Sequence, residues 1–110
     1  MRQVIAFRRY FLDFFHVQPE QVKAKILWTL ELVETLPQIP SKFFKHVEGT
    51  RGLYEIRIEV DSNTFRVFSF FDEGNLVILG NAFQKKSRKT PRTEIEKALQ
   101  ILKEYYSEKK

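Results

Sequence analysis

The chain has 110 residues, no cysteine, and 19 lysines and arginines against 14 aspartates and glutamates, which gives a formal net charge of +5 at pH 7. The lack of cysteine excludes disulfides and thiolate metal sites, and no run approaches the roughly 18 apolar residues of a membrane span. The first residues also lack the apolar segment of a signal peptide. We therefore expect residues 1–110 to form one soluble, cytoplasmic domain with a single aromatic-rich core.

Residues 3–6 are predicted to form a short strand. A periodic series of aromatic residues over 7–15 predicts that a helix follows it. Its side chains recur at i, i+3, i+4, i+7 and i+8, the spacing of one helix face, and they are Phe7, Tyr10, Phe11, Phe14 and Phe15. Pro19 suits the first turn of a second helix, which Pro37 and Pro40 should end. The apolar stripe of this second helix is Val22, Ile26, Leu30 and Val33, widened by Trp28 and Leu32.

Three strands are expected after a loop at residues 37–52. Residues 53–60, 65–71 and 76–83 are rich in β-branched and aromatic side chains, and the short turn-forming runs between them favour antiparallel pairing. Thr90 is then expected to cap a last helix that has Pro91 at its first position. The apolar face of that helix comprises Ile95, Ala98, Leu99, Leu102, Tyr105 and Tyr106. The order β-α-α-β-β-β-α predicts an α+β fold, with two N-terminal helices and a C-terminal helix around a small antiparallel sheet.

The register of the three strands decides which side chains share a face. Four-residue loops at 61–64 and 72–75 would place Arg57 opposite Phe68 and Arg66 opposite Asn81, whereas a three-residue turn at 61–63 would bury an unpaired guanidinium. One face then carries Glu55, Arg57, Glu59, Arg66, Phe68, Phe70, Leu79, Asn81, Phe83 and Lys85. The uncharged face, expected to lie against the Phe-rich first helix, carries Ile56, Ile58, Phe65, Val67, Ser69, Phe71, Ile78, Gly80 and Ala82. We expect the last helix to cover the apolar part of the charged face and to leave its cationic part open.

The segment "FQKKSRKTPR", residues 83–92, holds five basic residues and no acid, so its charge of +5 equals the net charge of the whole chain. The five bases are Lys85, Lys86, Arg88, Lys89 and Arg92. A localised excess of this kind favours a polyanionic partner, which can be a nucleic acid, an acidic protein or a membrane surface. Arginine binds phosphate through two hydrogen bonds, and an exposed Phe83 or Phe68 could stack an unpaired base. The alternative is that Arg57 and Arg66 are ordinary cross-strand partners of glutamates on a solvated sheet face.

The two histidines differ in their expected roles. His16 is expected to be a helix-end residue, and His46, which lies among bases in "KFFKHVEG", is a candidate to help at the RNA site. Their wide separation and the lack of His-x-x-x-His spacing speak against a metal site. We expect no cofactor.

Several of these segments together closely resemble the RelE/ParE toxin superfamily, specifically its phage-associated HigB-like branch. They are "FFKHVEGTRG", "GLYEIRIE", "FRVFSFFDEGN", "LGNAFQKKSRKTP" and a helix that begins "EIEKA" and ends "EYY". The resemblance implies the toxin of a two-gene toxin–antitoxin module, a ribosome-dependent mRNA endonuclease that inhibits translation and uses no metal. It also implies a helix-turn-helix, HigA-like antitoxin as partner, no membrane association, and a heterotetramer as one assembly with that antitoxin.

Carried over residue by residue, the resemblance places Arg57, Arg66 and Lys85 or Lys86 at the catalytic basic positions. They would align and stabilise attack by the RNA 2′-hydroxyl on the adjacent phosphate. Arg88, Lys89, Arg92, Asn81, Phe83 and His46 are the expected RNA-binding residues. The sequence departs from the family pattern because "KTPRTEIE" lacks the usual tyrosine and Asn81 stands where many relatives carry histidine. Two alternatives therefore stay open: a non-catalytic, ParE-like inhibitor of DNA gyrase, and an RNA-binding domain whose nuclease activity has decayed.

Overall fold

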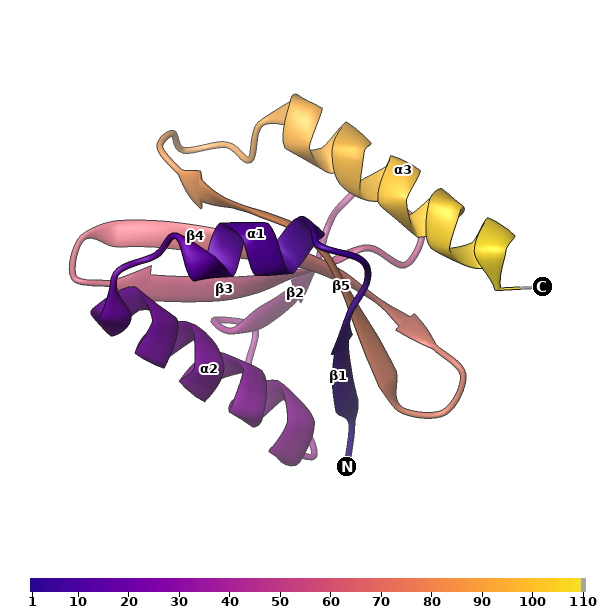
Figure 1. The fold of residues 1–110 in the computed structure, drawn as a ribbon, viewed down its shortest axis with the longest axis horizontal. Coiled ribbons are helices and arrows are strands. Elements are labelled where there is room, and N and C mark those ends of the chain that lie inside the picture. The colour runs from indigo at the N-terminus through magenta and orange to yellow at the C-terminus, as the bar shows by residue number, and fades with distance from the viewer. Residues whose placement is uncertain (110) are drawn as a thin grey trace.

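A computed structural model describes residues 1–109 as three helices and one five-stranded sheet (Figure 1). In chain order the elements are β1 (Gln3–Ala6), α1 (Tyr10–His16), α2 (Glu20–Thr35), β2 (Phe44–His46), β3 (Tyr54–Val60), β4 (Asn63–Asp72), β5 (Leu76–Lys85) and α3 (Arg92–Glu108). The strands lie in the order β1-β5-β4-β3-β2. The predicted α+β class is confirmed. The sheet is mixed rather than wholly antiparallel, because β1 runs parallel to β5.

The edge strand β2 is an element that the sequence pattern did not predict. It lies inside the expected loop 37–52 and pairs three residues with β3, from Phe44 opposite Ile56 to His46 opposite Tyr54. Three residues are too few to show a period-two pattern. Only residues 54–56 of β3 therefore pair with a strand on the outer side.

Helices α1 and α2 cover one face of the sheet and α3 covers the other (Figure 1). Helix α1 begins at Tyr10 and not at Phe7, because Arg8 has φ 53°, a left-handed conformation that interrupts the chain before the helix. Phe7 turns to the α3 side instead and meets the ring of Tyr105 edge-on, with the ring centroids 5.2 Å apart. Among the described residues no helix combines the length and the apolar character needed to cross a bilayer.

Helix α2 buries the apolar stripe that the sequence predicted, but not Trp28, which was expected to widen it. Val22, Ile26 and Val33 are buried, whereas Trp28 is 46% exposed. Thr29 is buried in its place, and its hydroxyl donates to the Lys25 carbonyl at 2.8 Å. Placing Trp28 in the core was therefore wrong: it lies on the outer side of the helix.

Helix α3 also differs from prediction in its cap and its buried face. Pro91, not Thr90, occupies the N-cap position, and no side chain caps the first turn. Ile101, which was not assigned to the apolar face, is 2% exposed, while the predicted Leu99 is 36% exposed. The helix therefore lies on the sheet through Ala98, as predicted, and through Ile101, which takes the buried position expected for Leu99.

Both predicted hairpin loops are too long. The β3–β4 loop holds two residues instead of four, so Val60 pairs with Asn63 and Arg57 lies opposite Arg66 rather than Phe68. A change of two residues keeps every side chain on its predicted face. The β4–β5 loop holds three residues, with Asp72 opposite Leu76, and this change of one residue reverses the faces next to the turn. Leu79 therefore packs with α1 and α2, and Ile78 packs with α3, the reverse of the prediction.

A bulge in β5 restores the predicted faces further along the strand. Ser69 pairs with Leu79 and Val67 with Ala82, so Phe68 faces the two residues Gly80 and Asn81. Beyond the bulge Arg66 lies opposite Phe83, and Thr64 opposite Lys85. Gly80 was expected to face the first helix, but it faces α3: a Cβ at this position would lie 3.6 Å from a side-chain carbon of Ile101.

Candidate nucleic-acid interface

Three cations lie side by side on the α3 face of β3, β4 and β5. Arg57 is directly opposite Arg66, and Lys85 is opposite Thr64, two residues before Arg66 on the same strand. Alternation along each strand puts all three side chains on one face, as the sequence predicted. Helix α3 packs on Phe68 and Phe83 of this face, and an open pocket beside Arg66 and Lys85 is lined by no residue of α3.

Glu55 holds the two arginines together. Its Oε1 accepts a hydrogen bond from Arg57 Nε at 3.0 Å and lies 3.3 Å from Arg66 Nε. Glu55 and Arg66 are both buried, whereas the side chain of Arg57 retains 27% of its exposure. A carboxylate between two guanidinium groups offsets their repulsion and fixes their positions before any ligand arrives. The expected Glu55 pairing therefore exists, but inside a buried cluster and not on a solvated face.

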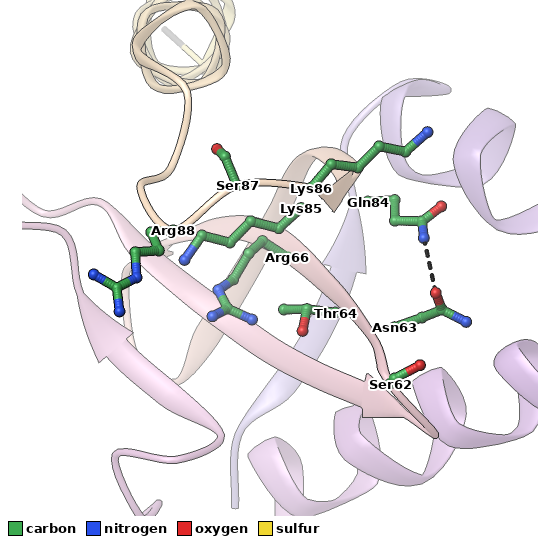
Figure 2. Close-up of a pocket in the computed structure, with 9 residues that line it drawn as sticks. All are labelled: Ser62, Asn63, Thr64, Arg66, Gln84, Lys85, Lys86, Ser87 and Arg88. Carbon is green, nitrogen blue, oxygen red and sulfur yellow. Dashed lines mark hydrogen bonds between the residues drawn. The ribbon is translucent and has the colours of Figure 1, made fainter.

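An open pocket of about 520 Å³ lies beside Arg66 at the ends of β4 and β5 (Figure 2). It is lined by Ser62, Asn63, Thr64, Arg66, Gln84, Lys85, Lys86, Ser87 and Arg88. Figure 2 shows the charged ends of Arg66, Lys85 and Arg88 turned toward the same side, while Lys86 extends in the opposite direction. Gln84 Nε2 donates to Asn63 Oδ1 at 3.2 Å and joins the two strands at the pocket rim.

The electrostatic environment of the pocket favours an anionic ligand. Burial, and then the charges of Arg66 and Arg57, lower the pKa of Lys85. Burial is also the main cause that lowers the pKa of Arg66, while the neighbouring Glu55 acts in the opposite direction. In both residues burial disfavours the charged form, and the negative charge of a bound phosphate would stabilise it.

The other residues predicted to bind RNA lie outside this pocket. His46 is on β2, where its Nε2 is 2.9 Å from the Thr50 carbonyl and its ring packs on Tyr54. Asn81 is buried under α3, and its Nδ2 donates to the Glu94 carbonyl at 3.2 Å. Phe83 is partly buried against Phe68, with the ring centroids 5.7 Å apart. Phe68 is fully buried, so the expectation that it could be exposed for stacking was wrong.

Of the three basic residues that follow Lys86, only Arg88 lies at the pocket. Arg88 lines the pocket, whereas Lys89 and Arg92 are exposed outside its lining. Arg92 pairs with Glu96 one turn further along α3, with Nε and Oε2 3.2 Å apart. Arg88 is thus the loop residue best placed to act with Arg66 and Lys85.

Two charged residues at this face escaped the sequence reasoning. Glu55 was treated as an ordinary partner although it is the centre of the arginine cluster. Lys45 lies opposite Glu55 on β2 and adds a further cation to the same face. Lys45 could not be assigned to this face without β2, whereas the alternation of acids and bases in "YEIRIE" is the signal from which the charge cluster could have been predicted.

The part of the chain that the structure describes, residues 1–109, contains no group of three or more histidine, cysteine or acidic side chains arranged to hold a metal ion. The pocket itself is lined by lysine, arginine, hydroxyl and amide side chains.

The sheet order and the helices on its two faces define a RelE-like α+β protein. The structure is similar to the crystal structure of an archaeal RelE–RelB complex from Pyrococcus horikoshii OT3, with a TM-score of 0.55 and 15% sequence identity. The match covers 80% of this chain and 98% of the archaeal one. At this identity it establishes the fold.

The sequence itself identifies the family. The profile of the family described as Phage derived protein Gp49-like (DUF891) matches residues 13–103. The chain belongs to this Gp49-like family, and the predicted RelE-like classification is confirmed. No curated protein matches the sequence.

Proposed function

We propose that this chain is the toxin of a toxin–antitoxin module and that it cleaves mRNA on the translating ribosome. The observation that carries the proposal is the convergence of Arg66, Lys85 and Arg88 in one open pocket of a RelE-like fold. Two cations on adjacent strands, with a third on the loop that follows β5, suit a phosphodiester backbone. The Gp49-like family assignment agrees with this reading.

The reaction is transfer of a phosphoryl group within the RNA. The 2′-oxygen attacks the adjacent phosphorus, the bond from phosphorus to the 5′-oxygen breaks, and a 2′,3′-cyclic phosphate and a 5′-hydroxyl are left. The 2′-hydroxyl gives up its proton and the departing 5′-oxygen gains one. Arg66, with Arg57 behind it across the strands, would stabilise the negative charge that builds on the phosphoryl oxygens.

The proton transfers need a group that can exchange a proton, and Lys85 is the best candidate. The lining of the pocket includes no histidine, tyrosine or carboxylate. Lys85 lies inside it, and its lowered pKa makes its proton easier to donate to the 5′-oxygen. Lys86 points away and His46 lies on the far edge strand, so each would need a rearrangement, or help from the ribosome, to take this role.

The proposed partner is an antitoxin. The archaeal relative was solved as a RelE–RelB complex. For this chain the resemblance favours a helix-turn-helix antitoxin, and an adjacent small gene for such a protein would support the module.

A second candidate function is RNA binding without cleavage. The specific observation in its favour is that the pocket lacks the usual acid and base groups while it keeps its cations. The same protein would then arrest translation weakly or not at all, because a missing general acid or base costs a factor of about 10²–10⁴.

Induced expression distinguishes the candidates. Growth arrest with newly cleaved transcripts supports the nuclease, and Arg66→Ala should restore growth, since loss of one charge-stabilising donor costs a factor of about 10²–10³ in rate. Arg9→Ala, which removes an exposed arginine that pairs with Asp13 and lies outside the pocket lining, is the matched control and should stay toxic. Arrest with intact transcripts and DNA damage would instead indicate gyrase as the target, and no arrest with salt-sensitive RNA binding would indicate the second candidate.

A further inference from the structure

A second pocket lies at the outer edge of the sheet, where β3 has no neighbouring strand. The pairing with β2 ends at Ile56, and the edge of β3 from Ile58 to Val60 has no strand beside it within residues 1–109. Side chains from both faces of the sheet therefore meet around this edge. The resulting pocket of about 350 Å³ is lined by Arg57 from one face and by Trp28 of α2 from the other.

The pocket has an aromatic wall that is open to solvent. Trp28 is 46% exposed, and its ring meets Phe43 edge-on with the centroids 5.7 Å apart and the planes at 77°. An exposed tryptophan beside a half-buried phenylalanine in a concave site is a surface on which a planar group can pack. Neither side chain belongs to the buried core clusters.

Lysines lie over both aromatic rings. Lys25 Nζ is 4.8 Å from the centroid of Trp28, and Lys42 Nζ is 5.1 Å from the centroid of Phe43. Neither lysine forms an ion pair within the described part of the chain, so each ammonium group is held by its ring alone. An exposed cation–π contact contributes only about 0.5–1 kcal/mol, which leaves these lysines free to move onto a phosphate.

Arg57 connects this pocket to the cationic pocket. Its Nε binds Glu55, whose carboxylate also meets Arg66, and its side chain lines the second pocket. A strand of nucleic acid that leaves Lys85 and Arg66 and crosses Arg57 would reach Lys25 and Trp28 next. Arg57 thus lies next to Arg66 across the strands and shares the second pocket with Lys25 and Lys42.

We infer that Trp28 and Phe43, with Lys25 and Lys42, form a subsite that stacks an unpaired base of single-stranded RNA next to the cleavage pocket. This inference rests on the proposed function, whose substrate it extends beyond the scissile phosphate. Arginine and lysine contacts follow the phosphates, and aromatic rings bind bases with little regard to sequence.

The acids at this pocket suggest one competing occupant, a cationic peptide. Glu59 and Asp61 also line it, although three cations outnumber them. Both rings already carry lysines of the protein itself, and an incoming cationic side chain would meet like charge there. A neutral base with a flanking phosphate meets no such repulsion.

Fluorescence of Trp28, the single tryptophan of the chain, provides a direct test. The full chain is titrated with a seven-nucleotide single-stranded RNA carrying 2′-O-methyl groups, which cannot be cleaved because the attacking hydroxyl is blocked. Stacking should quench the emission of Trp28. Trp28→Ala and Phe43→Ala should each weaken binding of the same RNA, measured by polarisation of an end label, by about 5- to 150-fold.

Matched variants separate stacking from loss of structure. Trp28→Phe keeps a ring and should bind RNA within about three-fold of the unsubstituted chain. Leu27→Ala removes a side chain that is 55% exposed on the same helix and outside the pocket lining, and it should leave binding unchanged. Thermal unfolding of each variant shows whether it is folded at the assay temperature.

The outcomes distinguish this inference from the proposed function. If RNA binds and Arg66→Ala weakens it, but Trp28→Ala binds as tightly as the unsubstituted chain and Trp28 emission does not change, the subsite is overturned and the proposed function stands. If oligolysine quenches Trp28 and RNA does not, the pocket takes cationic peptides and the subsite is likewise overturned. If no RNA binds at all, the subsite is overturned, whereas the proposed function is decided separately by whether induced expression yields newly cleaved transcripts.

Discussion

Arg57 and Arg66 lie directly opposite each other on β3 and β4, and the carboxylate of Glu55 sits between them at 3.0 and 3.3 Å from the two Nε atoms. Like charges opposite each other on adjacent strands destabilise a sheet. The side chains of Arg66 and Glu55 are only 6% and 10% exposed, so water cannot screen this repulsion well. The acid is therefore needed for the cationic pair to be held in the folded state.

Replacing Glu55 with glutamine should destabilise the fold. The substitution keeps the size of the side chain but leaves two guanidinium groups without their shared counterion. Breaking a buried ion pair costs about 3–5 kcal/mol, and we expect about 2–4 kcal/mol here because part of the pair is solvated. Urea denaturation followed by circular dichroism measures the difference. Glu59→Gln, an exposed change on the same strand, should shift the free energy of unfolding by less than about 0.5 kcal/mol, and an equal loss in both variants would contradict the assigned role of Glu55.

The neighbouring lysines Lys85 and Lys86 should differ sharply in function. Lys85→Gln should reduce the rate of mRNA cleavage in a purified translation system by about 10²-fold or more, because the variant loses the proposed proton donor. Lys86→Gln should reduce it less than about ten-fold, since its side chain extends away from Arg66 and Lys85. Primer extension across the cleavage site measures both. The reverse order of effects would transfer the proposed role to Lys86.

The carboxylate of Asp72 should make stability fall in acid. Hydrogen bonds from Lys109, Tyr105 and the Glu73 backbone lower its pKa to about 2. The folded pKa lies below that of the unfolded chain, so this contribution to stability is complete above about pH 4 and is lost as the pH falls toward 2. Melting temperatures measured from pH 5 to pH 2 should fall less steeply for Asp72→Asn than for the unsubstituted chain. Asp13→Asn, which removes a mostly exposed partner of Arg9, should leave the slope unchanged.

The hydrogen bond between Tyr105 and Asp72 should also make stability depend on pH in the alkaline range. This hydrogen bond raises the pKa of the Tyr105 phenol to about 12. A raised pKa means that the stability it provides is present below about pH 10 and is lost as the pH rises toward 12. Asp72→Asn should weaken this loss as well, and ultraviolet titration of the tyrosines provides an independent check.

The attachment of α3 to the sheet should depend on Ile101. This side chain is 2% exposed and packs with Phe70 and Ile78, so Ile101→Ala should cost about 2–5 kcal/mol of unfolding free energy. Leu99→Ala, which shortens a side chain that is 36% exposed, should cost less than about 1 kcal/mol. Equal losses would contradict the finding that Ile101, and not Leu99, attaches α3 to the sheet.

Face assignments were more predictable than strand pairs. The β3–β4 loop is two residues shorter than expected, and an even error does not change which way Arg57 or Arg66 points. Lys85 shares the face of Arg66, as predicted, because two one-residue changes add to an even shift: the β4–β5 loop is one residue shorter than expected, and the bulge shifts the register by one more. Next to that turn, where only the first change acts, Leu79 and Ile78 have the reverse of their predicted faces.

The missed features depend on contacts between distant segments. Strand β2 is defined by its hydrogen bonds to β3, which no local pattern of three residues reveals. Trp28 leaves the core because Thr29 can satisfy its hydroxyl within the helix and fill the buried position. The burial of Glu55 follows from the pairing of Arg57 with Arg66, which the predicted register did not contain.

The extra residue in β5 also affects the loop that carries Arg88. At the bulge, Asn81 does not pair with a residue of β4. Its Nδ2 donates instead to two oxygens of Glu94 on α3, the backbone carbonyl at 3.2 Å and Oε1 at 3.1 Å. Residues 86–91 therefore span two anchored points, the end of β5 and the first turn of α3. A short connection fixed at both ends has little conformational freedom left to lose, so Arg88 can meet an anion at a small entropic cost.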